Sequence, residues 1–408
     1  MAEDAGRRLA ARAATAGAVE RALLRATMRA LPQAGFAVEL WDGTRAGEAG
    51  GPLVRIRDRG ALWRLVRNPE LHFGDLYAEG RVEVEGDLVL FLERAYRAIE
   101  AGRRARASSL LRLWRDVAPR SRSLAAARDN IHHHYDLGND FYALWLDRDA
   151  MQYTCAYFPE PGMTLEGAQR VKMHHVSRKL RLQPGQLVFE AGCGWGGFAL
   201  FMAREYGVRV RAWNISQEQV RYARERARRE GLADRVEFIE DDYRNVRGRC
   251  DVFVSVGMLE HVGPENYGAL GAVIDRCLAP EGLGLIHTIG RNRPGLMNAW
   301  IEKRIFPGAQ PPALSQMMAI FEPYGFSVLD VENLRLHYAE TLRHWRSRFR
   351  AAREEVRAGR GEAFVRAWDL YLAGSIAAFT TGALQLFQVV FARGENNALP
   401  ASRRHLYA

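Results

Sequence analysis

The chain has 408 residues, of which 48% are hydrophobic and 26% are charged, close to the values of ordinary soluble globular domains. This composition excludes a wholly disordered chain, a collagen-like protein and a protein with many membrane spans. The four cysteines form no CxxC pair, which excludes a disulfide scaffold and a zinc ribbon and favours a reduced, cytoplasmic setting.

The net charge of +10 is concentrated in one segment. Residues 103–128 contain eight arginines and a single acidic residue, Asp116. Such a segment suits an anionic surface, either nucleic acid or a membrane leaflet, and a solvated linker explains it equally well. No base-reading or stacking module accompanies the charge, so we expect no nucleic-acid partner.

Neither end of the chain indicates export or a membrane span. The first residues are rich in Ala and Arg and lack the apolar stretch of a secretory signal. Residues 370–392 carry no charge, but polar groups such as Thr380 and Gln385 would have to be hidden from lipid. We therefore expect no transmembrane helix there, and we read residues 384–393 as a buried strand.

The pattern of elements divides the chain into three parts. Residues 1–102 mix strands, at 51–58 and 80–86, with a helix at 88–102, and form an α+β amino-terminal domain without a catalytic constellation. A basic linker follows at 103–128. From 129 to 408, strands alternate with helices, which predicts a doubly wound α/β sheet of the Rossmann type. The expected strands are 187–190, 208–214, 236–240, 251–256 and 283–289, and the expected helices are 164–180, 216–230, 265–278 and one that begins near 198.

A glycine loop follows the first of these strands. The sequence Glu190-Ala-Gly-Cys-Gly-Trp-Gly-Gly197 allows tight turns and close approach of a ligand at Gly192 and Gly194. It is neither a phosphate-binding GxGxxG nor a P-loop. Glu190 would repel a pyrophosphate but suits a cationic group, so the loop favours S-adenosylmethionine (SAM) over NAD, with another nucleotide or a purely structural loop as alternatives.

The next two strands end in polar residues. Asn214, Ser216 and Gln219 follow the second strand, where many dinucleotide folds place an acid for the ribose. Asp241 and Asp242 follow the third strand. We expect Asp242 to accept a hydrogen bond from the adenine amine and Asp241 to cap a turn.

Several ordered blocks identify a family. They are HYDLGNDFY at 134–142, MQYTCAYF at 151–158, GCGWGG at 192–197, SVGMLEHVG at 255–263, HTIG at 287–290, IFPG at 305–308, HYAETL at 337–342 and QLFQVVF at 385–391. The chain resembles the cyclopropane-fatty-acyl-phospholipid synthases and the related mycolic acid cyclopropane synthases over about residues 130–395. FGDLYAEG at 73–80 also resembles the amino-terminal helper domain of the phospholipid synthases, which the mycolic acid enzymes lack.

The resemblance implies a class I SAM-dependent methyltransferase that adds a methylene across a cis double bond of an unsaturated membrane phospholipid. It implies that Tyr153, Trp195 and Gly196 join the SAM site. The implied base is a bound bicarbonate, which takes a proton from the new methyl group. The implied ligands of this bicarbonate are Cys155, Glu260, His287 and Tyr338, with the backbone of Ile289.

The resemblance also implies a cytoplasmic enzyme that associates peripherally with the inner face of the membrane, and a homodimer by analogy. His132, His133 and His134 lack carboxylates at metal spacing, so we expect no metal site. Two positions depart from the family pattern: Ser375 replaces a usual Cys, and Asn214 replaces a usual Thr. The alternatives are a related methyltransferase that stops at a methyl branch or methylates a small amine, and a lipid-binding protein whose enzyme domain has decayed.

Overall fold

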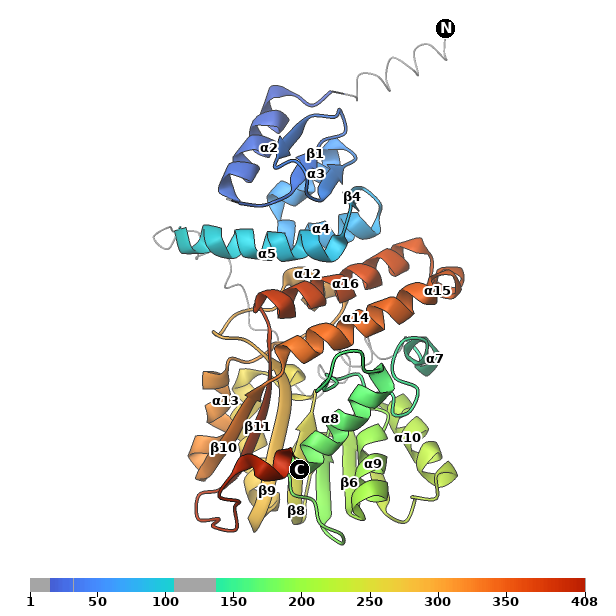
Figure 1. The fold of residues 1–408 in the computed structure, drawn as a ribbon, viewed down its shortest axis with the longest axis vertical. Coiled ribbons are helices and arrows are strands. Elements are labelled where there is room, and N and C mark those ends of the chain that lie inside the picture. Colours follow the sequence, from blue (N-terminus) through green and yellow to red (C-terminus); the bar gives the residue numbers. More distant parts are fainter. Residues whose placement is uncertain (1–14, 32, 106–136, 408) are drawn as a thin grey trace. The chain divides into compact units, whose positions relative to one another are not determined.

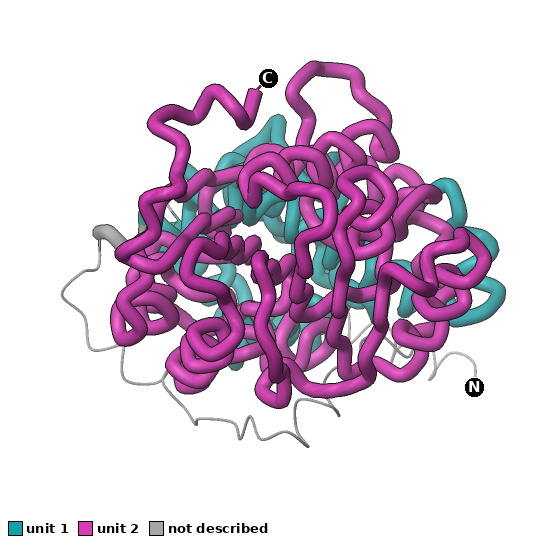
Figure 2. The backbone as a smooth tube through the Cα atoms, turned by 90° about the horizontal axis from the view of Figure 1, so that it is seen from below, with its two compact units in different colours: residues 1–119, 298–300, 350–381 teal, residues 120–297, 301–349, 382–408 magenta. Residues whose placement is uncertain are grey.

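A computed structural model describes residues 15–31, 33–105 and 137–407. The chain forms two compact units (Figure 2), the first made of residues 1–119, 298–300 and 350–381 and the second of residues 120–297, 301–349 and 382–408. The sequence-based boundaries assigned residues 350–381 to the catalytic domain, whereas the structure groups them with the amino-terminal residues. Most of the basic segment, at 106–128, and His132, His133 and His134 lie outside the described residues.

The smaller unit combines a four-stranded sheet with helices (Figure 1). The strand order is β2-β1-β3-β4, with β1 parallel to β3 and the other pairs antiparallel. The strands expected at 51–58 and 80–86 are β3 and β4. The elements are α2 (Ala18–Ala30), β1 (Ala37–Glu39), β2 (Arg45–Gly47), β3 (Leu53–Ile56), α3 (Arg59–Arg67), α4 (Pro69–Ala78), β4 (Val82–Glu85), α5 (Leu88–Ala105), α15 (Arg353–Arg360) and α16 (Glu362–Thr381).

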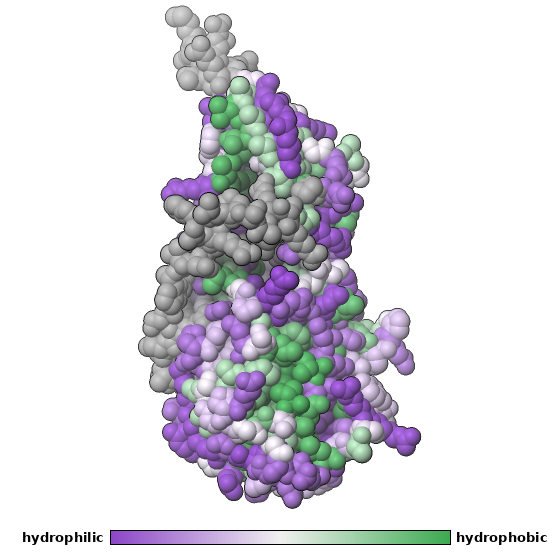
Figure 3. All heavy atoms as spheres, turned by 90° about the vertical axis from the view of Figure 1, so that its left-hand side faces the viewer, coloured by the Kyte–Doolittle hydropathy of each residue, from purple (hydrophilic) through white to green (hydrophobic). Residues whose placement is uncertain are grey.

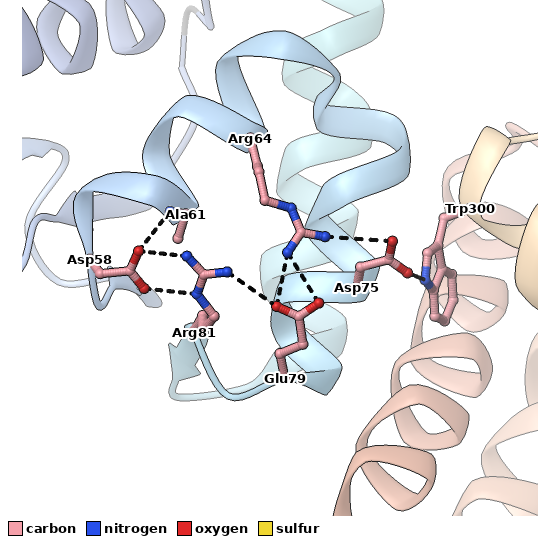
Figure 4. Close-up of polar contacts among 7 residues, drawn as sticks. All are labelled: Asp58, Ala61, Arg64, Asp75, Glu79, Arg81 and Trp300. Atoms are coloured by element: carbon pink, nitrogen blue, oxygen red, sulfur yellow. Dashed lines mark hydrogen bonds and ion pairs between the residues drawn. The ribbon is translucent and has the colours of Figure 1, made fainter.

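Helix α4 carries most of the FGDLYAEG block and packs through its glycine. A Cβ atom on Gly74 would lie 2.3 Å from the ring of Trp300, so only glycine lets the indole lie against this helix. The indole Nε1 donates to Asp75 Oδ1 at 3.2 Å (Figure 4). Glu79 accepts from Arg64 at 2.9 Å and from Arg81 at 3.4 Å (Figure 4). These contacts give the block a role in packing.

The larger unit is built on a seven-stranded sheet of order β10-β11-β9-β8-β5-β6-β7. Its strands are β5 (Leu187–Ala191), β6 (Arg209–Asn214), β7 (Val236–Glu240), β8 (Cys250–Val256), β9 (Leu278–Gly290), β10 (Phe326–Asn333) and β11 (Gln385–Arg393). Its helices include α7 (Asn139–Ala143), α8 (Leu165–Lys179), α9 (Gly197–Tyr206), α10 (Gln217–Arg229), α11 (Tyr267–Cys277) and α13 (Leu314–Phe321). Two further helices, α12 (Ala299–Arg304) and α14 (Arg335–Ala351), contain residues of both units.

Successive side chains along the strands pack alternately into two hydrophobic cores, one on each face of this sheet. Val188 of β5 packs with α8, α9 and α10, for example against Val176 and Leu200. The next residue, Phe189, packs with α11 and α13 in the other core. The sheet is therefore covered on both faces, and the predicted doubly wound α/β fold is confirmed.

The strand order predicts where a ligand binds. From β5 the chain continues to β6 and β7 on one side and then crosses to β8 and β9 on the other. All of these strands pair in parallel. In open α/β sheets, ligands bind outside the carboxyl ends of the strands at such a switch point. We therefore look for the site beyond the ends of β5 and β8.

The end of the chain departs from a purely parallel sheet. The strand expected at 384–393 is β11, which is buried and antiparallel to both β9 and β10. The uncharged residues that precede it belong to α16. Across the described ranges, no helix combines the length and apolarity needed to cross a membrane.

Strand β10 forms one edge of the sheet. Leu329 and Val331 on this strand are each 37% exposed. Figure 3 shows apolar side chains gathered on the face of the larger unit that carries β10 and α13. In the strand order, β11 and β9 lie between β10 and β8. This surface is therefore separate from the ends of β5 and β8.

Candidate active site

The loop that joins β5 to α9 turns at three glycines with positive φ. Gly192, Gly194 and Gly196 have φ values of 84°, 53° and 78°, a region that other residues enter at a cost of ~1–2 kcal/mol. A Cβ on Gly192 would lie 2.8 Å from the Cβ of Met258, and one on Gly196 would lie 2.5 Å from the Phe238 ring. A Cβ on Gly194 would meet no atom within 4 Å. Two of these glycines therefore allow close packing, and Gly194 leaves open space.

A cavity lies at the carboxyl ends of β5, β6, β7 and β8, where the strand order predicts a ligand. Its wall includes most of the residues expected to bind SAM, namely Tyr153, Glu190, Gly192, Gly194, Trp195, Asn214, Gln219 and Asp242. Two expected residues are not on this wall. Gly196 packs against Phe238, and Ser216 caps α10 by accepting a hydrogen bond from Gln219 N at 3.4 Å.

Glu190 brings a buried carboxyl group to the cavity. Its Oε2 atom has no hydrogen-bond partner among the described residues. Burial raises the pKa of Glu190 to about 8, although the neighbouring ammonium of Lys172 acts in the opposite direction. A buried carboxyl group with a free oxygen suits a ligand that supplies a cationic donor, such as the ammonium of a methionyl group.

Asn214 connects the glycine loop to α10. Its Nδ2 atom donates to Gln219 Oε1 at 2.8 Å and to Gly194 O at 3.2 Å. Asn214, which stands where the family usually has Thr, therefore lies on the cavity wall and holds the glycine loop at Gly194.

Asp242 has structural partners as well as a place on the cavity wall. It caps a 3-10 turn by accepting from Arg244 N at 2.9 Å, and both of its oxygens accept from the Arg244 guanidinium. The capping role expected for Asp241 thus belongs to Asp242. Asp241 instead accepts from Asp242 N and from Asn245. Both carboxylates line the cavity, and the adenine contact of Asp242 stays a prediction.

The four expected catalytic side chains come from four separate segments. Cys155 lies in the loop after α7, Glu260 in a 3-10 turn after β8, His287 in β9 and Tyr338 in α14. None of them is on the wall of the cavity described above, but Thr154 and His261, neighbours of Cys155 and Glu260, are on it.

Backbone hydrogen bonds bring these segments to the same end of the sheet. Leu334 accepts from Tyr338 N at 3.1 Å, and Cys155 Sγ lies 3.8 Å from the same carbonyl oxygen. Leu334 N donates to Leu386 O at 2.8 Å. Leu386 of β11 lies opposite Ile289 of β9 in the sheet register. Cys155 and Tyr338 are thereby linked to the end of the strand that carries His287.

Glu260 reaches the same strand end from the other side. The amide of Ile289 donates to Glu260 Oε1 at 2.6 Å, so this backbone donor, expected to hold bicarbonate, is already engaged by the carboxylate. Glu260 Oε2 and His287 Nε2 are both buried and have no hydrogen-bond partner in the described parts of the chain. One more acceptor and donor are therefore available to a ligand at the end of β9.

Burial sets the protonation of these groups. It raises the pKa of Glu260 to about 7, lowers that of His287 well below its usual range and raises that of the Cys155 thiol above its usual range. Near neutral pH, His287 is therefore a neutral imidazole and Cys155 a thiol. Both can donate a hydrogen bond, and the thiol is a poor base.

Comparison with known proteins identifies the family of this chain. The family model for mycolic acid cyclopropane synthetase matches residues 122–389. The chain belongs to the mycolic acid cyclopropane synthetase family. It is 38% identical over 356 residues to the cyclopropane-fatty-acyl-phospholipid synthase of Escherichia coli, covering 86% of this chain and 90% of that one. It is 37% identical over 395 residues to a probable fatty acid methyltransferase of Pseudomonas putida, covering 91% and 95%.

Solved structures of cyclopropane synthases share the fold of this family member. The cyclopropane synthase MmaA2 from Mycobacterium tuberculosis superposes with a TM-score of 0.62 at 28% identity, covering 68% of this chain and 100% of that one. The mycolic acid cyclopropane synthase CmaA1, solved with S-adenosylhomocysteine, gives a TM-score of 0.61 at 30% identity, covering 65% and 97%. The chain is a SAM-dependent methyltransferase, as the sequence predicted.

The sequence reasoning missed two buried cations of this cyclopropane synthetase family member, Lys172 and Lys179 on α8. Lys172 on α8 donates to Gln152 Oε1 and to Thr154 Oγ1 at 2.9 Å, and both partners line the cavity. Burial lowers the pKa of Lys172 to about 8. Its charge acts on Glu190, Cys155 and His287.

The available signal was the rarity of lysine. The chain contains only three, Lys172, Lys179 and Lys303, against 55 arginines. Lys172 and Lys179 are both buried on α8. Two of the three lysines of an arginine-rich chain therefore lie within one helix, and this is the signal that points to them.

Proposed function

We propose that this enzyme transfers a methylene group from SAM across a cis double bond of an unsaturated phospholipid acyl chain. The observation that carries the proposal is the pair of unpartnered buried atoms, Glu260 Oε2 and His287 Nε2, at the end of β9. The alignment with the E. coli phospholipid synthase covers 86% of this chain and includes the amino-terminal residues that carry FGDLYAEG, which favours phospholipid over mycolic acid as the substrate class.

An isolated alkene is a weak nucleophile that needs positioning and exclusion of water more than activation. The cavity beside Glu190 and Gly194 orients SAM in this scheme. The ring of Tyr153 lies edge-on to Trp145 at 5.2 Å between centroids and tilted to Trp345 at 5.3 Å, and Tyr338 lies edge-on to Trp345 at 5.8 Å. Aromatic faces of this kind stabilise a passing carbocation through cation–π contact.

Methyl transfer to the alkene leaves a carbocation, and ring closure requires removal of a proton from the new methyl group. Bound bicarbonate would supply the base for this proton. The donor set fits such an anion: the His287 Nε2–H and the Tyr338 hydroxyl donate, and Glu260 Oε2 accepts the bicarbonate proton. The Cys155 thiol, which donates to Ala156 O at 3.1 Å in this structure, would have to turn to the anion to join them. The Ile289 amide contributes indirectly, because it holds Glu260 Oε1 in place.

The basic segment 103–128 is proposed to bring the enzyme to its substrate at the inner face of the membrane. Anionic lipid headgroups attract each basic residue by about 1 kcal/mol. We also propose a homodimer in solution, by analogy with relatives.

Lipid analysis tests the proposed reaction. Cells lacking their own cyclopropane synthase are given this gene, and their phospholipid acyl chains are examined by mass spectrometry with fragmentation at the former double bond. We expect a gain of one CH₂ unit, loss of the double bond and ring fragments. A methyl-branched product would favour the alternative methyltransferase, for which the tuberculostearic acid methyltransferase UfaA1 of M. tuberculosis, 34% identical over 92% of this chain, is a precedent. Unchanged lipids would contradict both.

A further inference from the structure

A chain of buried polar side chains leads away from His287 on the side opposite its free nitrogen. His287 Nδ1 lies 3.1 Å from Gln388 Nε2, and Gln388 Oε1 accepts from Lys179 Nζ at 2.7 Å. Lys179 Nζ also donates to Glu332 Oε2 at 2.5 Å, and His175 Nε2 lies 2.7 Å from the same oxygen. His287, Gln388 and Lys179 are at most 3% exposed, so these contacts are shielded from water.

The chemistry of lysine fixes the orientation of the amide. An ammonium group has three donors and no acceptor, so only the oxygen of Gln388 can face Lys179. The NH₂ group of Gln388 then faces His287. Turning the amide around would point its two N–H donors at a buried ammonium and leave the ammonium without this acceptor, at the cost of a buried unsatisfied group.

The orientation of the amide in turn fixes the imidazole. An amide NH₂ group only donates, so Nδ1 of His287 must accept and carries no proton. A neutral imidazole holds one proton, which must then be on Nε2. Nε2 is the buried atom that lacks a partner within the described ranges. The side chain therefore presents an N–H donor toward its unfilled position.

Glu332 is the acidic partner of Lys179. Burial lowers the pKa of Lys179, while the charge and the hydrogen bond of Glu332 act in the opposite direction and favour the ammonium. Burial acts to raise the pKa of Glu332, but hydrogen bonds from His175 and Lys179 and the charge of Lys179 lower it to about 2. The carboxylate is therefore ionised and compensates the burial of Lys179. The ion pair spans α8 and β10, while Gln388 and His287 are paired residues on β11 and β9.

We propose that Lys179 and Gln388 are positioning residues that lock His287 in the Nε2–H tautomer, so that it donates a hydrogen bond to the anion at the active site. This inference rests on the proposed function for the identity of the anion. The tautomer itself follows from the contacts of this chain. Neither Lys179 nor Gln388 contacts the reacting atoms in this scheme, and both act through His287.

The first test is spectroscopic and needs no turnover. Protein labelled with ¹⁵N-histidine is studied at neutral pH by long-range ¹H–¹⁵N correlation, and the His287 signals are assigned from their loss in His287→Asn. We expect the pattern of a neutral ring with the proton on Nε2. A ring protonated on Nδ1, or on both nitrogens, would overturn the proposal.

The second test replaces the hydrogen-bond donor that faces His287 Nδ1 by an acceptor. In Gln388→Glu a carboxylate faces Nδ1 and requires a proton there, so we expect the His287 signals to change to Nδ1-protonated or doubly protonated forms. The value of kcat should fall about 10- to 100-fold, as for the loss of a hydrogen bond to a charged group, while the Kd for SAM stays within about twofold. Gln385→Glu is the matched control, because Gln385 is on the same strand and is bonded to Gly382 O and Asn333 instead. Its His287 signals should match the wild type.

A second pair of variants keeps the proposal testable if Gln388→Glu does not fold. Lys179→Met removes the donor that orients the amide and should produce a mixture of tautomers with reduced kcat. Lys179→Arg keeps a donor-only cation and should restore both the tautomer and most of the activity. Wild-type signals and activity in Lys179→Met would show that the lysine has no positioning role. Failure of the lipid assay with an intact Nε2–H signal would instead refute only the proposed reaction.

Discussion

Glu190, Glu260 and His287 are buried, and each keeps a polar side-chain atom without a partner in the described parts of the chain. A buried polar group without a hydrogen bond costs about 1–3 kcal/mol. These three atoms occur near the end of β5 and β9, where the SAM and anion sites are proposed. We interpret the cost as preorganisation for ligands that complete these hydrogen bonds.

Glu190 should make the stability of the ligand-free enzyme depend on pH. Its pKa is about 8 in the folded protein against 4.5 for an ordinary glutamate. Between these values the folded protein keeps a proton that the unfolded chain has lost, so the free energy of unfolding falls as pH rises, by up to ~1.4 kcal/mol per unit. Chemical denaturation from pH 5.5 to 7.5 should show a shallower decline for Glu190→Gln than for the wild type.

The exposed Glu281 supplies the control for this measurement, because Glu281→Gln should keep the wild-type slope. Saturating SAM should also flatten the wild-type curve, since an ammonium beside Glu190 favours its ionised form. Equal slopes for the wild type and Glu190→Gln would show that this carboxyl group is not shifted.

Gly194 is the glycine of the loop where a side chain would enter open space at the cavity wall. We expect Gly194→Val to weaken SAM binding by about tenfold or more in calorimetry, at a stability cost of ~1–2 kcal/mol for its φ of 53°. Gly231→Val is the matched control, because Gly231 has a φ of 67° and an equally open Cβ position but is not on the cavity wall. Equal SAM affinity in both variants would refute the placement of the cofactor.

The site residues were predicted unevenly from the sequence. The glycine loop and the resemblance made Glu190, Glu260 and His287 candidates, because their positions within ordered blocks are local properties of the chain. The partners of His287 could not be found in this way. Gln388 and Lys179 lie about 100 residues from His287 on either side, and only the register of β9 with β11 and the packing of α8 bring them to it.

At the scale of elements, the packing of helix α4 predicts the sign of the stability change caused by a substitution at Gly74. Replacing a glycine inside a helix by alanine usually stabilises by about 0.5–1 kcal/mol. At Gly74 the new Cβ would lie 2.3 Å from the Trp300 ring, so overpacking should dominate and Gly74→Ala should destabilise the protein by ~1–3 kcal/mol.

Gly359 in α15 provides the opposite case, because a Cβ there meets no atom within 4 Å. Gly359→Ala should therefore leave stability unchanged or raise it. Thermal denaturation of both variants gives the comparison, and stabilisation by Gly74→Ala would contradict the packing of Trp300 against α4.

The strands and helices from residue 187 to 290 were predictable, because buried parallel strands are short apolar runs. Helices follow β5, β6 and β8 in the chain, whereas β7 leads through a short turn to β8. The antiparallel strands β10 and β11 were harder. Residues 384–393 were recognisable as a strand, but their position between β9 and β10 depends on pairing across about 100 residues.

At the scale of the whole molecule, the sequence could not predict that residues 350–381 and 298–300 group with the amino-terminal unit. It rests on contacts of α16 with α4 and α5 and of Trp300 with Gly74, which join segments more than 200 residues apart. The departure at Ser375 lies on α16 within this unit.

The basic segment makes a prediction about membrane association. Replacing Arg112, Arg115, Arg120 and Arg122 by Gln should weaken binding to anionic vesicles by up to ~1 kcal/mol per residue and reduce its dependence on salt. The control removes equal charge from exposed arginines of the larger unit, at Arg228, Arg229, Arg235 and Arg249. Co-sedimentation that is equal for the two quadruple variants would identify residues 103–128 as a plain linker.

The central claim is that the base is a small anion held by Cys155, Glu260, His287 and Tyr338. The most direct measurement is turnover of the purified enzyme in degassed, bicarbonate-depleted buffer, followed by addition of bicarbonate, with SAM affinity measured in parallel. We predict that turnover is low, that bicarbonate restores it at unchanged SAM affinity, and that Glu260→Gln abolishes the restoration. Turnover that is indifferent to bicarbonate, with Glu260→Gln retaining most of its activity, would contradict the account.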